Sequence, residues 1–224
     1  STPAFAADTP TNPEDAGSPI AANVTVVNDY RYRGISQSNF KPAIQGGFDY
    51  AHESGFYIGN WNSSISWISD AASAGGKNNV SAPIEMDFYA GFKKELIGEG
   101  FASDIGVLQY YYPTSGVFNT PVVRTNPATF VNPNTTEIYA AQNFTFGPLT
   151  GNAKFSYALT NMFGTVNSNG STYPEINLNY DTGVWGVGVN AHAGIQTFAG
   201  TAPNGTTYYN GTVVPNGTNN NNLY

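Results

Sequence analysis

The stretch Tyr173-Pro174-Glu175-Ile176-Asn177-Leu178-Asn179-Tyr180 alternates polar and apolar side chains one residue at a time. From Glu175 on its odd positions are polar, and from Ile176 on its even positions are apolar. Successive side chains of a strand point to opposite faces, so this period of two indicates a β-strand and not a helix. Segment 185–196 repeats the alternation after the compact turn Asp181-Thr182-Gly183. The two segments are therefore predicted to form a hairpin.

The same alternation recurs along most of the chain. Nine strands are predicted, at 21–32, 42–52, 56–67, 83–93, 101–112, 135–146, 151–160, 173–180 and 185–196. The connections after the second, fourth, sixth and eighth strands are short, and the others are long. Alternating segments of about ten residues, with short turns at one end and long loops at the other, are typical of outer-membrane barrels. The predicted fold is all-β, a transmembrane antiparallel up-and-down β-barrel.

Composition agrees with a barrel and argues against other classes. Only 10% of the 224 residues are charged, although 40% are hydrophobic, and an ordinary soluble domain has roughly 25% charged residues. No run approaches the ~18 apolar residues of a spanning helix. A secreted β-sandwich is the alternative, but such proteins often use disulfides and this chain has no cysteine. The net charge of -7 and the lack of a basic patch argue against nucleic acid as a partner.

Three regions are predicted along the chain. Residues 1–19 are read as a signal-peptide remnant and flexible lead-in, because Ala4-Phe5-Ala6 fits a small-x-small cleavage pattern. Residues 20–198 hold the barrel strands, and 199–224 form a long outward loop without a predicted strand. Short connections of such barrels face the periplasm, which predicts the bacterial outer membrane with a periplasmic N-terminus. Single-chain bacterial barrels have an even number of strands. The odd number of nine predicted strands therefore predicts that the sequence is truncated in this last loop.

The charged side chains are expected inside the barrel, because a Lys or Arg facing lipid near the midplane costs about 2–4 kcal/mol. The predicted pore-lining residues are Asp29, Arg31, Arg33, Asp49, Glu85, Asp87, Lys93, Asp104, Glu137, Lys154, Glu175 and His192. Acids outnumber bases in the set, which predicts a narrow water-filled pore with a mild cation preference. The alternative is that these acids and bases pair into a polar plug that does not conduct.

Asp29, Arg31 and Arg33 form the sharpest cluster, since alternate positions place all three on one face of a strand. Two guanidinium groups could hold an anionic solute or set a constriction. Alternatively, they neutralise Asp49 and Glu85 on neighbouring strands.

The tryptophans and several tyrosines are expected in belts at the lipid headgroups, with sugar stacking as the alternative role. This set is Trp61, Trp67, Trp185, Tyr30, Tyr50, Tyr57, Tyr111 and Tyr180.

No catalytic, cofactor or metal site is predicted. A barrel hydrolase needs a histidine beside a serine and a third orienting group. Gly-x-Ser-x-Gly is absent, and Ser156 could approach His192 only inside the barrel. His52 belongs to a turn at a different height, and the chain has no cysteine, so no set of metal ligands is predicted.

The first predicted strand also carries a family resemblance. Asn28-Asp29-Tyr30-Arg31-Tyr32-Arg33-Gly34-Ile35-Ser36-Gln37-Ser38 resembles the opening motif of the TorF family of porin-like proteins. Segments 42–59, 85–91, 106–113 and 136–139 continue the match, which covers about 20–198. The loops at 69–82 and 113–134 look enlarged, and the last strands of the family are absent. The resemblance implies an outer-membrane barrel, of twelve strands in the complete protein.

The predicted function is a porin-like channel for passive diffusion of small hydrophilic solutes or ions, surrounded by outer-membrane lipid. The protein is not expected to be an enzyme and needs no cofactor. The alternative is a non-conducting barrel whose long surface loops serve adhesion or partner binding. No interface signal decides whether the barrel forms an oligomer.

Overall fold

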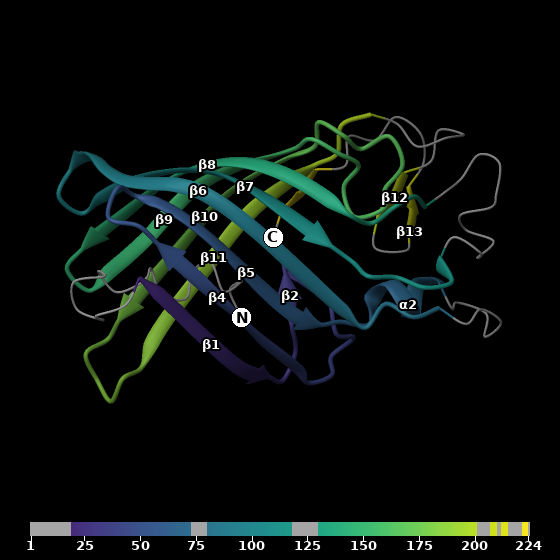
Figure 1. Ribbon diagram of the computed structural model, residues 1–224, viewed down its shortest axis with the longest axis horizontal. Coiled ribbons are helices and arrows are strands. Elements are labelled where there is room, and N and C mark those ends of the chain that lie inside the picture. The colour runs from purple at the N-terminus through teal and green to yellow at the C-terminus, as the bar shows by residue number, and fades with distance from the viewer. Residues whose placement is uncertain are drawn as a thin grey trace.

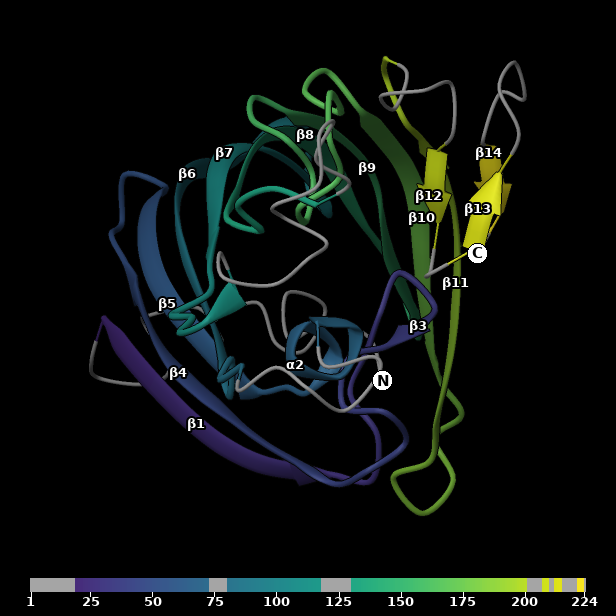
Figure 2. The same ribbon diagram turned by 90° about the vertical axis from the view of Figure 1, so that its right-hand side faces the viewer.

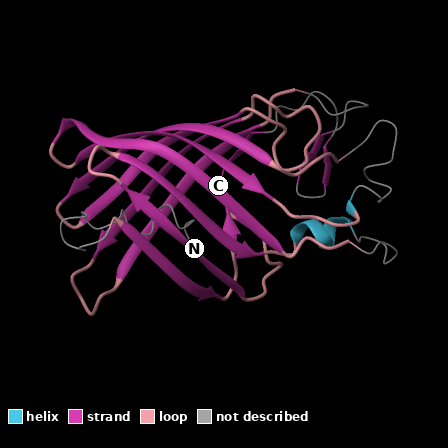
Figure 3. Cartoon of the chain, in the orientation of Figure 1, coloured by secondary structure: helices cyan, strands magenta, loops and turns pink. Residues whose placement is uncertain are grey.

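The structure is a computed structural model that describes residues 19–72, 80–117 and 130–200, together with short strands at 207–209, 212–214 and 221–223. Its main feature is one antiparallel sheet whose long strands follow one another up and down (Figure 1; Figure 3). The nine long strands are β1 Ile20–Val27, β4 Ala43–Ala51, β5 Phe56–Ser64, β6 Ile84–Gly98, β7 Phe101–Tyr111, β8 Thr135–Phe146, β9 Leu149–Ala158, β10 Thr172–Asp181 and β11 Gly188–Thr197. The predicted all-β, antiparallel up-and-down arrangement is confirmed.

The sheet curls around an interior, as the view in Figure 2 shows. Its edges are β1 and a tenth strand, β14 (Asn221–Leu223), which pairs with β11 through three residue pairs. No pairing among the described strands joins β1 to β11 or β14. The described sheet is therefore a curved, barrel-like wall and not a closed barrel.

Short and long connections lie at opposite ends of the wall, as predicted (Figure 1). The short connections are 52–55, 99–100, 147–148 and 182–187. The long ones contain two small elements that were not predicted. A hairpin of β2 (Arg31–Tyr32) and β3 (Ile35–Ser36) follows β1, and helix α2 (Trp67–Ala72) follows β5. Both lie inside the curve of the wall at the long-loop end (Figure 2).

Several predicted boundaries were wrong. The strand predicted at 21–32 ends at Val27, and the strand predicted at 83–93 extends to Gly98. Trp185 lies in the turn before β11, with a positive φ of 52°, instead of on the strand. The tail, where no strand was predicted, contributes β12 (Thr207–Tyr209), β13 (Thr212–Val214) and β14. The predicted signal remnant lies outside the described residues.

The two faces of the wall differ in chemistry because side chains alternate along each strand. The outward face exposes large apolar side chains, among them Val24, Ile44, Phe88, Ile105 and Ile138. The inward face carries the polar residues. The buried apolar core also lies inside, near the long loops, and includes Tyr30, Trp61, Ile68, Leu108, Tyr110, Tyr112 and Val117. The core therefore lies inside the curve of the wall.

Tyrosines of the inner face lie over glycines of neighbouring strands. A Cβ added to Gly91 would come within 3.0 Å of Tyr57, one on Gly59 would meet Tyr89, and one on Gly106 would meet Tyr139. Gly194 and Tyr173 make the same contact on β11 and β10. The missing side chain of each glycine thus provides the space for a ring that lies along the wall.

Candidate functional site

The interior divides into two halves that differ in burial. Towards the long loops, polar and charged side chains are fully covered: Glu85, Asp87 and Glu137 are each at most 2% exposed. Towards the short turns, interior side chains such as Asp49, Lys93 and Asp104 remain partly exposed. We refer to these as the long-loop half and the short-turn half of the interior. Solvent therefore reaches the short-turn half, whereas the long-loop half is packed.

The β2–β3 hairpin closes part of the long-loop half. Its strands pair Arg31 with Ser36 and Tyr32 with Ile35, so Arg33 and Gly34 form a two-residue turn. Both turn residues have positive φ, 46° and 77°, as a type I′ turn requires. This turn directs the Arg33 side chain into the interior, where it is 7% exposed.

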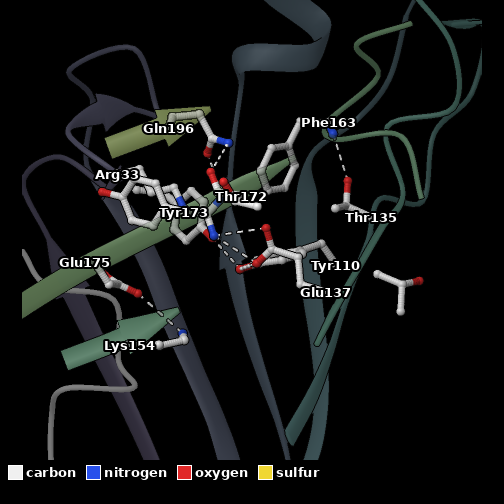
Figure 4. Close-up of polar contacts among 12 residues, drawn as sticks. Arg33, Tyr110, Thr135, Glu137, Lys154, Phe163, Thr172, Tyr173, Glu175 and Gln196 are labelled. Carbon is white, nitrogen blue, oxygen red and sulfur yellow. Dashed lines mark hydrogen bonds and ion pairs between the residues drawn. The ribbon is translucent and has the colours of Figure 1, made fainter. Parts of the chain in front are cut away.

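Arg33 is held by residues of three wall strands (Figure 4). Its Nη2 atom donates to both carboxylate oxygens of Glu137 on β8, at 3.0 and 2.9 Å, and Nη1 donates to Oε1 of Gln196 on β11 at 3.0 Å. The guanidinium carbon lies 4.1 Å from the ring centre of Tyr173 on β10. We call Glu137, Tyr173 and Gln196 the Arg33 site. It combines charge, hydrogen bonding and a cation–π contact in one buried place.

A second buried carboxylate anchors the loops that flank the hairpin. Glu85 on β6 accepts a hydrogen bond from the Tyr30 hydroxyl at 2.6 Å and another from the Tyr112 hydroxyl at 2.5 Å. Tyr30 precedes the hairpin and Tyr112 follows β7, so both lie outside the wall strands. Burial and the nearby Glu85 carboxylate raise the pKa of Tyr30 well above its ordinary value. The tyrosine therefore stays neutral and remains a donor to Glu85.

The short-turn half carries a network of charged and polar side chains. Lys154 Nζ lies 3.6 Å from Oε1 of Glu175, and the other oxygen of Glu175 lies 3.6 Å from Nδ1 of His192. His192 also bonds Tyr173 through Nε2 at 2.9 Å. Because Tyr173 belongs to the Arg33 site, the two halves of the interior are in direct contact through this residue.

The hairpin is also fastened at its base by Asp29. Asp29 accepts hydrogen bonds from Ser36 at 2.5 Å and Ser38 at 3.2 Å and pairs with Arg31 at 2.8 Å. Burial alone would raise the pKa of Asp29, but the bonds from Ser36 and Ser38 and the Arg31 guanidinium outweigh it and lower the pKa. The carboxylate is thus charged over a wider pH range than an isolated aspartate.

Comparison with known proteins gives a family. The family described as "Bacterial protein of unknown function (Gcw_chp)" matches residues 11–211. The chain belongs to the Gcw_chp family. No curated protein and no solved structure gives a significant match. The Gcw_chp match supplies no activity, so the function of the site has to be argued from its geometry, and the resemblance to the TorF family stays a prediction.

Most of the predicted pore-lining residues do face the interior. The structure places ten of the twelve there: Arg33, Asp49, Glu85, Asp87, Lys93, Asp104, Glu137, Lys154, Glu175 and His192. Asp29 and Arg31 do not lie on the first strand, as was predicted, because β1 ends at Val27; the two residues form an ion pair beyond it. Nor does Arg33 neutralise Asp49 or Glu85 on neighbouring strands, since its carboxylate partner is Glu137.

The prediction of aromatic belts was wrong for half of its members. Tyr30 and Trp61 are buried core residues in edge-to-face contact, and Tyr57 points inward to donate to Asp104 at 2.7 Å. Trp67 lies on α2 and packs edge to face against Tyr112. Of the other four, Tyr111, Tyr180 and Trp185 are exposed and Tyr50 is half-buried, and for these the belt stays a prediction.

The part of Tyr173 and Gln196 in holding Arg33 was not predicted. The sequence contains no signal for it, because the contact depends on where an unpredicted hairpin enters the interior. Within the described residues, no group of three or more His, Cys, Asp or Glu is placed to hold a metal ion. No helix in the described part of the chain is long and apolar enough to cross a membrane.

Proposed function

We propose that this protein is an outer-membrane β-barrel that passes small hydrophilic solutes or ions by passive diffusion, with a mild preference for cations. The observation that carries the proposal is the difference between the two faces of one wall. Ile105 and Val107 are exposed on the outward face of β7, while Asp104 on the same strand faces inward and accepts a bond from Tyr57. An apolar exterior around a polar interior is the arrangement of transmembrane barrels.

The cation preference follows from the buried charges. Among the described residues, the long-loop half buries the acidic side chains of Glu85, Asp87 and Glu137, against one buried guanidinium, that of Arg33. Carboxylates around a narrow passage lower the energy of a cation that passes them. In the short-turn half, the carboxylates of Asp49, Asp104 and Glu175 share the inward face with the ammonium groups of Lys93 and Lys154, so acids outnumber bases there as well, since histidine is counted as neutral at pH 7.

The packed long-loop half supports a second candidate. In this conformation the hairpin, α2 and the aromatic core fill the interior near the long loops. A channel would have to displace the hairpin before it conducts. A barrel that keeps this packing would instead present its long loops to a partner or surface without conducting. The two candidates differ in one measurable property, which is conductance.

Planar bilayers containing the full-length protein provide the test, with single-channel current and reversal potential recorded in a salt gradient. The proposal expects rare openings in the wild type and more frequent openings in Glu137→Gln, because this variant releases the hairpin. It also expects a cation-selective reversal potential. Anion selectivity would contradict the role of the carboxylates. The absence of current from folded wild type and folded Glu137→Gln would favour the loop-presenting barrel.

A further inference from the structure

The Arg33 site is built by the wall, and the hairpin only fills it. Glu137, Tyr173 and Gln196 come from β8, β10 and β11, whereas Arg33 arrives on the first long connection. We infer that this site is a binding site for guanidinium-bearing solutes, that Arg33 is its tethered occupant, and that free guanidinium compounds compete with Arg33 for it.

The contacts suit a planar cation with several N–H donors. Glu137 accepts two bonds from one nitrogen, Gln196 accepts a third bond from another nitrogen, and the Tyr173 ring lies beneath the guanidinium carbon. A guanidinium presents five donors in a plane and stacks on aromatic faces, whereas an ammonium is a compact point charge. The site therefore matches the flat shape of a guanidinium and accepts hydrogen bonds from its two terminal nitrogens, while the Arg33 Nε atom has no partner among the described residues.

The backbone of Arg33 indicates that its side chain has a specific role. Both residues of the turn need positive φ, and type I′ turns strongly favour Asn-Gly or Gly-Gly for this reason. Arg33 adopts a φ of 46° without the freedom of glycine. Such unfavourable backbone conformations persist where the surroundings hold them in place, and they concentrate at ligand contacts. Here the surroundings that hold Arg33 are the contacts of its guanidinium.

A further buried acidic side chain, Asp87 on β6, interacts electrostatically with Glu137 of the site. Asp87 is 1% exposed, and its Oδ1 atom has no hydrogen-bond partner among the described residues. Buried polar atoms are nearly always paired, so an unpaired carboxylate oxygen is an unused acceptor for a donor-rich cation. The described acids do not gather as a metal site. An organic cation with N–H groups fits this environment better than a metal ion.

The site can be reached from the solvent-accessible half. Glu175 follows Tyr173 by two residues on β10, so both share the inward face; the side chain of the neighbouring His192 is 22% exposed and that of Glu175 8%. A solute in the short-turn half would meet Glu175 next to the Arg33 site. The inference rests on the proposed membrane barrel for this access, but its test does not require conduction.

The test is rescue of Arg33→Ala by methylguanidinium chloride. Full-length protein in detergent is heated, and the unfolding midpoint is measured by circular dichroism in millimolar methylguanidinium chloride or in sodium chloride of equal ionic strength. Arg33→Ala should lower the midpoint, and methylguanidinium should recover part of the loss. Tetramethylammonium, which has no N–H donor, should not. Arg31→Ala is the matched control, because Arg31 pairs with Asp29 outside the site, and it should show no recovery.

The double variant Arg33→Ala/Glu137→Gln identifies the place of binding. Without the carboxylate, the methylguanidinium concentration for half-maximal recovery should rise about tenfold or more, since a hydrogen bond to a charged group contributes at least that factor. Equal recovery with and without Glu137, or no recovery in Arg33→Ala, would overturn the inference. If Arg33→Ala does not fold in buffer, the fraction of protein that refolds is measured in place of the unfolding midpoint. A refolded fraction that is no higher in methylguanidinium chloride than in sodium chloride would then overturn the inference. A barrel that never conducts would still show the rescue, so the two proposals fail independently.

Discussion

Arg33 and Glu137, 104 residues apart in the sequence, form a buried ion pair in which one guanidinium nitrogen lies 2.9 and 3.0 Å from the two carboxylate oxygens. Their side chains are 6% and 1% exposed. The pair fastens the first long connection of the chain to β8. Desolvation of two buried charges is costly, so such a pair is held by good geometry and extra hydrogen bonds, which Gln196 supplies to Arg33 and the Tyr110 hydroxyl to Glu137.

Removal of one partner should therefore destabilise the protein strongly. Glu137→Gln leaves the Arg33 guanidinium buried without its counter-charge, and we expect the free energy of unfolding to fall by about 3–5 kcal/mol. Urea unfolding in detergent, followed by tryptophan fluorescence, measures this loss. Arg31→Met is the control, because the Arg31 side chain is 48% exposed in its pair with Asp29, and exposed pairs contribute about 0–1 kcal/mol. Equal losses in the two variants would show that the Arg33 pair does not hold the hairpin.

Glu85 ties together two loops through its two tyrosine donors. Tyr112→Phe removes one donor to a buried carboxylate and is expected to cost about 1.5–3 kcal/mol. In the Glu85→Gln background the same change should cost less, because the bond to a charged acceptor is already gone. Tyr111→Phe is the neighbouring control: Tyr111 is 43% exposed on the outward face, and such a surface change usually stays within about 0.5 kcal/mol. If both tyrosine variants have the same effect, the Glu85 bonds do not stabilise the loops.

The fold was largely predictable because the pattern of alternation determines which face each strand residue occupies. Ile84 to Lys93 alternate in the sequence, and Glu85 and Asp87 are buried while Phe88 and Phe92 are exposed. Segment 56–67 was ambiguous, since Phe56 and Ile58 on one parity and Trp61 on the other are all apolar. The structure exposes Phe56 and Ile58 and buries Trp61. An aromatic residue of the inner face cannot be distinguished from a lipid-facing one by hydropathy alone.

The candidate site was predictable only in part. The parity of Glu137, Glu175 and His192 placed them inside, and the structure agrees. The hairpin was missed because Tyr30 to Arg33 continue the alternation of β1, although the strand ends at Val27. What ends the strand is tertiary: Tyr30 turns into the interior to reach Glu85, 55 residues later in the chain. Contacts over such separations leave no local pattern in the sequence.

The contacts between glycine and tyrosine on the inner wall predict a selective effect of small substitutions. In Gly91→Ala the new methyl group would collide with the Tyr57 ring and with the backbone oxygen of Ile105. Overpacking of this kind costs about 1–3 kcal/mol. Gly98→Ala, on the same strand, would find no atom within 4 Å and should be nearly neutral. Unfolding free energies of the two variants check this. Similar unfolding free energies for Gly91→Ala and Gly98→Ala would mean that the wall and the Tyr57 ring shift to accommodate the new methyl group without cost.

The lowered pKa of Asp29 predicts that its contribution to stability depends on pH. A carboxyl with a lowered pKa in the folded state contributes stability that is complete above its unfolded pKa and is lost as the pH falls through the folded pKa. Asp29→Asn should therefore be less stable than wild type at neutral pH, and the difference should shrink as the pH falls below the ordinary aspartate value of 3.8. Unfolding midpoints of both proteins across a pH series measure it. If the difference between the two proteins does not change with pH, the hydrogen bonds from Ser36 and Ser38 stabilise the hairpin independently of the negative charge of Asp29.

The outward face gives the most direct test of membrane location. Ile105 lies near the middle of β7, 61% exposed on the apolar side of the wall. If that side contacts lipid, Ile105→Arg should lower the free energy of unfolding in bilayers by about 2–4 kcal/mol, because the guanidinium would lie in hydrocarbon. In a protein surrounded by water, the same surface change would cost about 0.5 kcal/mol or less. Val184→Arg is the control, since Val184 is 54% exposed in the turn between β10 and β11 and would lie outside the hydrocarbon. If Ile105→Arg and Val184→Arg change the free energy of unfolding equally little, the outward face of the wall contacts water, and the basis for a membrane channel is removed.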